Sequence, residues 1–192
     1  GPIAVEGMDQ RIVDVVRHRR GRTAVPPLPA GRGWLFVEVG GGSAAEVEAV
    51  ARALVADADA DEHRIVPDAD QAATLWRIRE DGSGLSGRSP AGAPAHAGWE
   101  DAAVPPERLG AYLRDFDALL TERGLTGMPY GHFGDGCVHV RIDFPLDGRD
   151  GVRIFREFLT DAARCGPSQP MIVCKPPSAA TAPVDIGGST PP

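Results

Sequence analysis

Apolar residues recur at helical spacing in five stretches of the chain. The clearest is residues 105–124, where the apolar side chains from Leu109 to Leu120 fall on one face and Gly124 follows as a natural stop. A second helix begins at Ser43, with Glu46 in the capping-box position. The five predicted helices span about residues 6–19, 43–54, 68–80, 105–124 and 152–162.

Period-two alternation and short apolar runs predict the strands. They are expected at residues 34–39, 63–66 and 98–104, and in a hairpin over residues 129–145, PYGHFGDGCVHVRIDFP. Asp135-Gly136 favours a two-residue turn, and in that register His132 faces His139. One face of the second strand is then core and the other polar; the core positions are Val138, Val140, Ile142 and Phe144, and the polar ones Cys137, His139, Arg141 and Asp143.

The two hairpin histidines are a candidate metal site. Directly opposed residues have Cβ atoms roughly 4.5–5.5 Å apart, which allows two imidazoles to converge on one divalent ion. Two histidines beside a turn are equally compatible with an ordinary solvated surface. The residue pattern alone leaves both interpretations open.

The order of predicted elements favours an α+β fold, with an antiparallel sheet and helices packed on one face. Residues 1–33 are interpreted as a helix and a Pro/Gly-rich connection, and residues 34–164 as the folded domain. From residue 165 to 192 repeated prolines interrupt any periodicity, which is typical of a disordered tail.

Two further patterns allow alternative interpretations. Gly40-x-Gly42-x-x-Ala45 with Asp68 fits a loose dinucleotide fingerprint, although a capped helix after a turn also explains it. Arg79 shares the apolar face of its predicted helix with Leu75 and Trp76. Its guanidinium either reaches the surface or presents its planar group to an anionic ligand.

Composition narrows the functional classes. The 192 residues carry a formal net charge of −7 with 42% hydrophobic residues, so a nucleic-acid partner held by a basic surface is not expected. No apolar run approaches the roughly 20 residues of a membrane span, and we expect a cytoplasmic protein. The three cysteines form no CxxC pair.

The motif GHFGDGCVH, together with LWRIRE and GWEDAAVPPERL, resembles the C-terminal, substrate-side domain of FAD-linked oxidases. This family includes D-lactate and D-2-hydroxyglutarate dehydrogenases, and within it the chain looks most like bacterial proteins that fuse the flavin module to iron–sulfur domains. The resemblance covers roughly residues 5–164. It implies a ferredoxin-like sheet that caps a separate FAD-binding domain.

The resemblance also implies site residues. His132 and His139 match histidines that hold a divalent metal such as zinc or manganese, Arg79 matches the arginine that binds the substrate carboxylate, and Ser83 matches a hydroxyl residue beside it. Trp99 stands where the D-2-hydroxyglutarate enzymes have a substrate-binding lysine. Cys137 replaces their asparagine.

The implied reaction is oxidation of a D-2-hydroxy acid, such as D-lactate, with hydride transfer to FAD and onward electron flow to iron–sulfur centres. Neither an FAD-binding domain nor the family's Glu-His segment with the catalytic base is recognisable in the 192 residues. We therefore expect a fragment that is inactive alone and that acts with an FAD-binding domain. The alternative hypothesis is a free-standing metal- or ligand-binding domain without redox activity.

Overall fold

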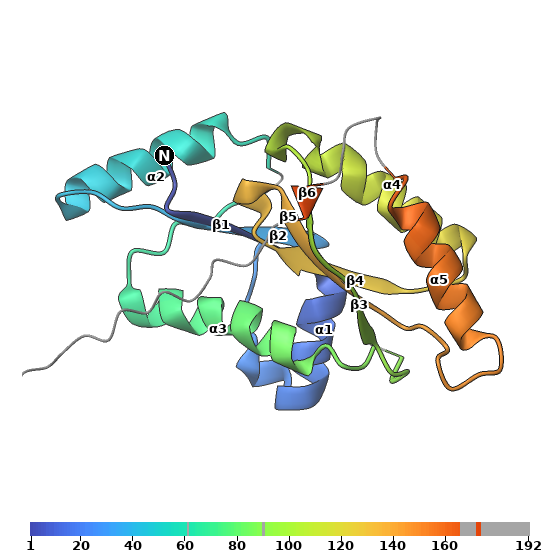
Figure 1. Cartoon of the computed structure of the whole chain (residues 1–192). Coiled ribbons are helices and arrows are strands. Elements are labelled where there is room, and N and C mark those ends of the chain that lie inside the picture. The colour runs from blue at the N-terminus through green and yellow to red at the C-terminus, as the bar shows by residue number, and fades with distance from the viewer. Residues whose placement is uncertain (61, 90, 166–171, 174–192) are drawn as a thin grey trace, which may run out of the picture.

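A six-stranded antiparallel sheet forms the centre of the computed structural model (Figure 1), which describes residues 1–60, 62–89, 91–165 and 172–173. Its strands lie in the order β2-β1-β4-β5-β3-β6. Strand bounds are β1 (Ala4–Asp9), β2 (Gly33–Glu38), β3 (His96–Ala103), β4 (Gly127–Gly131), β5 (Cys137–Ile142) and β6 (Ile172–Val173).

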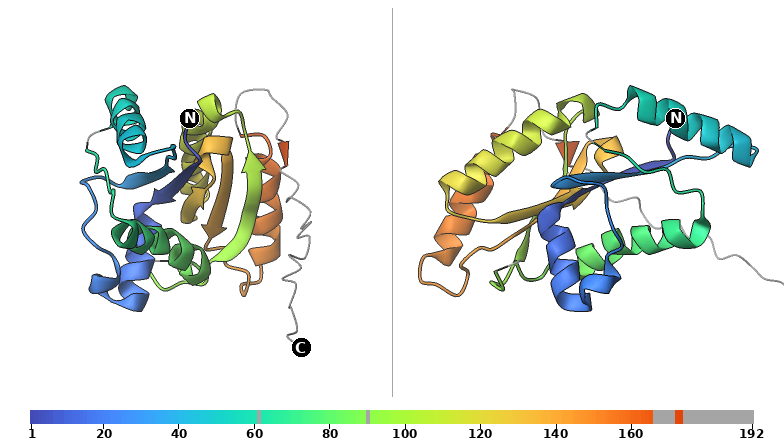
Figure 2. Two further views of the ribbon diagram at one scale, coloured as in Figure 1. Left: turned by 90° about the vertical axis from the view of Figure 1, so that its left-hand side faces the viewer. Right: turned by 180° about the vertical axis from the view of Figure 1, so that it is seen from behind.

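Helices lie on both sides of this sheet (Figures 1 and 2). Below β1 and β2 in Figure 1 lie α1 and α3, and above these strands lies α2. Beside the β3–β5 half lie α4 and α5. Helix bounds are α1 (Gln10–Arg20), α2 (Ala44–Asp57), α3 (Ala69–Leu85), α4 (Leu109–Glu122) and α5 (Gly151–Ala162), and the 3-10 turns are η1 (Arg22–Ala24), η2 (Pro106–Arg108) and η3 (Phe133–Asp135).

Two hydrophobic cores form on opposite faces of the sheet. On one face, β3 and β5 pack against α4 and α5, with Val138, Val140 and Phe158 almost completely buried. On the other face, β1 and β4 pack against α1 and α3 around Met8 and Met128. The α+β class and the antiparallel sheet are confirmed, and each of the two cores lies on one face of the sheet.

The N-terminal helix predicted over residues 6–19 is wrong in its first part, because residues 4–9 form β1. Glu6 and Met8 are both buried on the face that contacts α3 and β4, as strand alternation requires. The helix begins only at Gln10, where the Asp9 carboxylate caps it by accepting from the backbone N–H of Arg11 at 2.8 Å.

The strand predicted at residues 63–66 is also wrong. This segment has no regular structure, and side-chain bonds hold it beside residues 27–30 instead. Arg64 donates to the Pro27 carbonyl at 2.9 Å, and Glu62 accepts from the Ala30 backbone N–H at 2.8 Å. Because no strand forms at residues 63–66, the dinucleotide interpretation lacks the second strand that it requires, whereas the Ser43 cap of α2 is confirmed.

Most of the tail interpreted as disordered lies outside the described residues. Within residues 165–192, the structure describes Cys165 and the two-residue strand β6, which pairs with Ala102 and Ala103 of β3. In the described part of the chain no helix is long and apolar enough to cross a membrane.

The hairpin register differs from the prediction by two residues. Tyr130, not His132, lies opposite His139, because residues 132–136 form a longer connection that contains η3. The His132 carbonyl accepts from the backbone N–H groups of Asp135 and Cys137, each at 3.0 Å. A two-residue shift preserves the facing of each side chain, so Val138, Val140, Ile142 and Phe144 are buried as predicted. Cys137 is buried as well.

Gly136 is expected to be the least replaceable glycine of the hairpin. Its φ is +69°, and an added Cβ would overlap the Val104 carbonyl oxygen. Gly124 has a similar φ of +64° with open space around it, which makes it the matched control. Gly124→Ala should lower the free energy of unfolding by about 1–2 kcal/mol, and Gly136→Ala by distinctly more. Urea unfolding measures both; equal losses would contradict the close approach.

Candidate functional site

A buried carboxylate connects three separate elements on the α3-facing side of the sheet. Glu6 of β1 accepts from Arg79 Nε of α3 through Oε2 at 2.9 Å, and its Oε1 lies 2.6 Å from Nδ1 of His132 in the hairpin connection. The Glu6 and Arg79 side chains are only 11% and 13% exposed, whereas His132 is 51% exposed. The cluster therefore combines a nearly buried Glu6–Arg79 ion pair with the accessible imidazole of His132.

Tyr130 lies between this ionic pair and the second histidine. Arg79 Cζ lies 5.0 Å from the centroid of the Tyr130 ring, a cation–π distance. The Tyr130 and His139 ring centroids are 5.3 Å apart, and those of His132 and His139 are 5.6 Å apart in an edge-to-face arrangement. The structure thus brings Arg79, His132 and His139 into one cluster.

His139 has its own acidic partners on β3. Its Nδ1 lies 3.0 Å from Glu100 Oε2 and 3.7 Å from Asp101 Oδ1. Arg141 Nε, which is buried without a hydrogen-bond partner among the described residues, lies 3.7 Å from Glu100 Oε1. The pairing of β3 with β5 is irregular between Trp99 and Ala102, and this irregularity places both acids beside the histidine.

The histidine pair supplies two of the ligands that the metal implied by the resemblance would need. An ionised carboxylate only accepts, so Glu6 holds the Nδ1–H of His132 and leaves Nε2 as the ligand atom of that ring. A zinc site needs at least three protein ligands. Among the described residues, the group of three that could hold an ion contains His139 but not His132, so the pair does not complete a site there.

The two other predicted substrate residues bond to groups outside this cluster in the described contacts. The Ser83 hydroxyl donates to the Glu80 carbonyl of its own helix at 2.8 Å. Trp99 packs in the core between β3, α4 and α5, where its Nε1–H donates to the Tyr112 hydroxyl at 2.6 Å. Trp99 therefore supplies packing on the face of the sheet opposite to the histidines.

Sequence reasoning missed Glu6, Tyr130 and Asp101. Glu6 was assigned to a helix, and Tyr130 was left out because the predicted register paired His132 with His139. Asp101 reaches the site through an irregularity of β3 that no local sequence pattern predicts. In the structure its backbone has an unusual positive φ of +53°.

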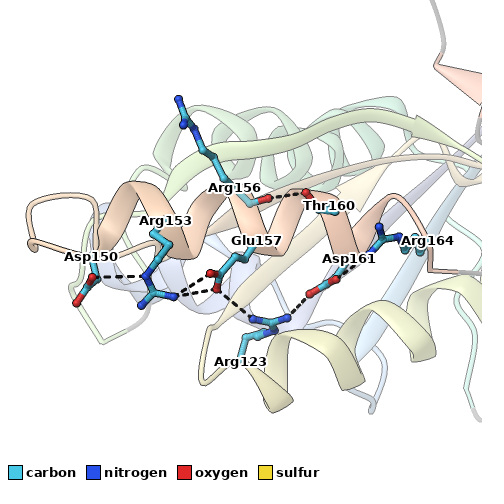
Figure 3. Close-up of polar contacts among 8 residues, drawn as sticks. All are labelled: Arg123, Asp150, Arg153, Arg156, Glu157, Thr160, Asp161 and Arg164. Carbon is cyan, nitrogen blue, oxygen red and sulfur yellow. Dashed lines mark hydrogen bonds and ion pairs between the residues drawn. The ribbon is translucent and has the colours of Figure 1, made fainter.

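A second polar cluster lies on the outer face of α5 (Figure 3). Arg123 pairs with Asp161 and lies 3.6 Å from Glu157, while Arg153 also binds Glu157 at 2.9 Å. Arg156 points away from these residues. The carboxylates are already neutralised by neighbouring arginines, so this cluster ties the end of α4 to α5.

Comparison with known families agrees with this architecture. The model of the family "FAD linked oxidases, C-terminal domain" matches residues 1–168. The chain belongs to this family. The match begins before β1 and runs past α5, so it includes Glu6, Arg79 and both histidines.

The relatives compared with the chain are described as D-2-hydroxyglutarate dehydrogenases. The chain is 31% identical over 165 residues to a D-2-hydroxyglutarate dehydrogenase of Pseudomonas putida, covering 79% of the chain and 16% of that protein. It is 30% identical over 155 residues to that of Pantoea ananatis, covering 72% and 15%. It is 37% identical over 67 residues to the D-2-hydroxyglutarate dehydrogenase of Escherichia coli, covering 35% of the chain and 7% of that protein. The chain thus spans a small part of these relatives.

Glu6→Gln should destabilise this FAD-linked oxidase domain, because the change leaves Arg79 nearly buried without a counter-charge. We expect a loss of about 3–5 kcal/mol in the free energy of unfolding, measured in urea. Glu48→Gln breaks the exposed Glu48–Arg52 pair of α2 and should cost less than about 1 kcal/mol. Similar losses in both variants would contradict the buried role of Glu6.

Tyr112 should make the domain sensitive to alkaline pH. Burial raises its pKa from 10.0 to about 12, against the lowering effect of the hydrogen bond from Trp99. The folded chain holds the Tyr112 proton more tightly than the unfolded chain does. The contribution of the neutral phenol to the free energy of unfolding is therefore complete below about pH 10 and is lost as pH rises toward 12. Tyr112→Phe should remove about 2–3 kcal/mol of this alkaline loss in urea titrations at successive pH values. Parallel pH profiles of the wild-type chain and the variant would contradict this role of Tyr112.

Proposed function

We propose that the chain is the substrate-side domain of an FAD-dependent D-2-hydroxyacid dehydrogenase, in which Arg79 binds the substrate carboxylate. The observation that supports this most directly is the position of Arg79 beside Tyr130 and, through Glu6, next to His132. Family membership supports an FAD-linked oxidoreductase of hydroxy acids. The specific substrate and the residue roles belong to the proposal.

Contacts with Glu6 and Tyr130 would hold the Arg79 guanidinium in an orientation that can bind a carboxylate. Glu6 engages Nε, and in the described contacts neither terminal nitrogen of the guanidinium is engaged. These two nitrogens form the part of an arginine that binds a planar carboxylate with two parallel hydrogen bonds. Glu6 thus fixes the orientation of Arg79 and leaves its binding edge for the ligand.

His132 and Tyr130 would orient the rest of the substrate. The exposed His132 ring donates to Glu6 through Nδ1, so its Nε2 lone pair can accept a hydrogen bond from the substrate hydroxyl. Tyr130 is buried and excludes water beneath the carboxylate. FAD, bound mainly outside these residues, would accept the hydride and pass the electrons to iron–sulfur centres.

The placement of Trp99 bears on substrate size. Its indole is in the core, so this position supplies no cation toward the histidine side of the sheet, where a second substrate carboxylate would need one. We therefore propose a D-lactate-like monocarboxylate. The relatives named above carry the description D-2-hydroxyglutarate dehydrogenase, which makes the dicarboxylate the competing substrate.

Arg79→Lys tests the proposed carboxylate contact in the complete FAD-containing protein. Lysine keeps the charge but loses the paired hydrogen bonds, so kcat/KM for D-lactate should fall by about 10- to 100-fold with unchanged flavin content. Dye reduction under substrate variation measures this, with D-2-hydroxyglutarate assayed in parallel.

Arg77→Lys is the matched control, because Arg77 lies on the same helix, is exposed and bonds only Thr74 among described residues. It should leave kcat/KM unchanged. An unaffected Arg79→Lys enzyme would overturn the proposed role of Arg79, and a higher kcat/KM for D-2-hydroxyglutarate than for D-lactate would overturn the proposed substrate.

A further inference from the structure

We infer that Asp101, Cys137 and His139 form a binding site for a zinc-like divalent metal ion. One ligand atom from each of these residues lies within 4.8 Å of the other two. The site uses a thiol and a carboxylate in place of His132, so it differs from the histidine pair expected from the hairpin motif. It does not depend on the substrate proposal.

The fold builds this site from two neighbouring strands. Cys137 and His139 are two residues apart on β5, so their side chains leave the same face of the sheet. On β3, the partner register jumps between Trp99, opposite Val140, and Ala102, opposite Val138. The extra residues Glu100 and Asp101 therefore meet the single residue His139, which lies between these two partners.

The charges around His139 favour a bound cation. Glu100 has Arg141 at 3.7 Å as a counter-charge, but Asp101 has no cationic partner other than His139 among the described contacts. Nδ1 of His139 also has conflicting neighbours: the Glu100 carboxylate needs a donor there, and the Asp101 backbone N–H needs an acceptor. A metal ion on Nδ1 would take its lone pair and balance the charges of Asp101 and the Cys137 thiolate.

The donor set selects the class of metal. A thiolate, an imidazole and a carboxylate together suit zinc or cobalt, and not magnesium or calcium, which prefer oxygen ligands. Metal–ligand distances of about 2.0–2.3 Å place tetrahedral ligands roughly 3.5 Å apart. Separations of up to 4.8 Å between the three atoms would therefore have to shorten when an ion binds. Three protein ligands leave a fourth position for water or for a ligand oxygen.

Access to the site is from the carboxylate side. Cys137 is buried and the His139 side chain is 15% exposed, whereas Asp101 is 42% exposed. An incoming ion would therefore meet Asp101 first and then the buried thiol. This order also makes Asp101 the safest residue to vary, because its replacement does not disturb the core.

Cobalt titration of the complete chain is the decisive experiment. A Co²⁺–thiolate bond gives an intense charge-transfer band in the near ultraviolet that histidine and carboxylate ligands do not produce. We expect this band in the wild-type chain and in a Cys165→Ser, Cys174→Ser double variant, which keeps Cys137 as the remaining cysteine. Burial, with Asp115 and Asp161, raises the pKa of the Cys165 thiol, which opposes metal binding there.

Three single variants separate this site from the alternatives. Cys137→Ser should abolish the band, and Asp101→Asn should weaken Co²⁺ and Zn²⁺ binding by about 10-fold or more. Asparagine is chosen because it tolerates the positive φ of Asp101. His132→Ala should leave band and affinity unchanged, and circular dichroism without metal verifies that each variant is folded.

The proposal is overturned by any of three results. Absence of Co²⁺ binding by the wild-type chain would make the cluster an ordinary ion-pair network. A band that survives Cys137→Ser would assign the metal to another thiol. Loss of binding in His132→Ala with retention in Asp101→Asn would assign it to the histidine pair. Each readout is independent of substrate turnover, so failure of the Arg79 proposal would not change it.

Discussion

The Glu6 carboxylate is the constraint on which the rest of the site depends. Nearly buried charges are stable only when they are paired, and here one carboxylate satisfies both Arg79 and His132. These three residues come from β1, α3 and the hairpin connection, so the ionic contact fixes the relative positions of three elements far apart in sequence. The site is therefore assembled across the sheet and does not belong to the hairpin alone.

The hairpin connection rests on β1 for a packing reason as well. The Phe133 ring occupies the space where Gly7 lacks a side chain, and Gly134 approaches Val5 so closely that a Cβ would contact its side chain. These two glycines allow η3 to lie directly on the strand. Because η3 follows His132 immediately, this packing holds the imidazole at the distance that its bond to Glu6 requires.

The sequence predicted those parts that local periodicity controls. Helices α3, α4 and α5 and the buried face of β5 are examples, since their apolar spacing reflects a single adjacent core. Glu6 was missed because Met8, Ile12, Val15 and Val16 continue a helical period through the end of β1. The strand predicted at residues 63–66 was wrong because a four-residue segment with two apolar residues does not reveal whether a neighbouring strand exists. The facing of His139 was retained because the register shift was even, whereas His132 lies in the connection and not on the strand where it was expected.

The site has two electrostatic halves joined by Tyr130 and His139. In one half Glu6 engages only Nε of Arg79 among the described contacts, so the terminal guanidinium nitrogens can bind an added anion. In the other half Glu100, Asp101 and Cys137 surround His139 with Arg141 as the nearest further cation, so an added cation is favoured. A 2-hydroxy acid carries a carboxylate and a neighbouring oxygen ligand. On both proposals its carboxylate would lie at the Arg79 half and its hydroxyl would donate to His132, whose ring lies beside His139 of the metal half.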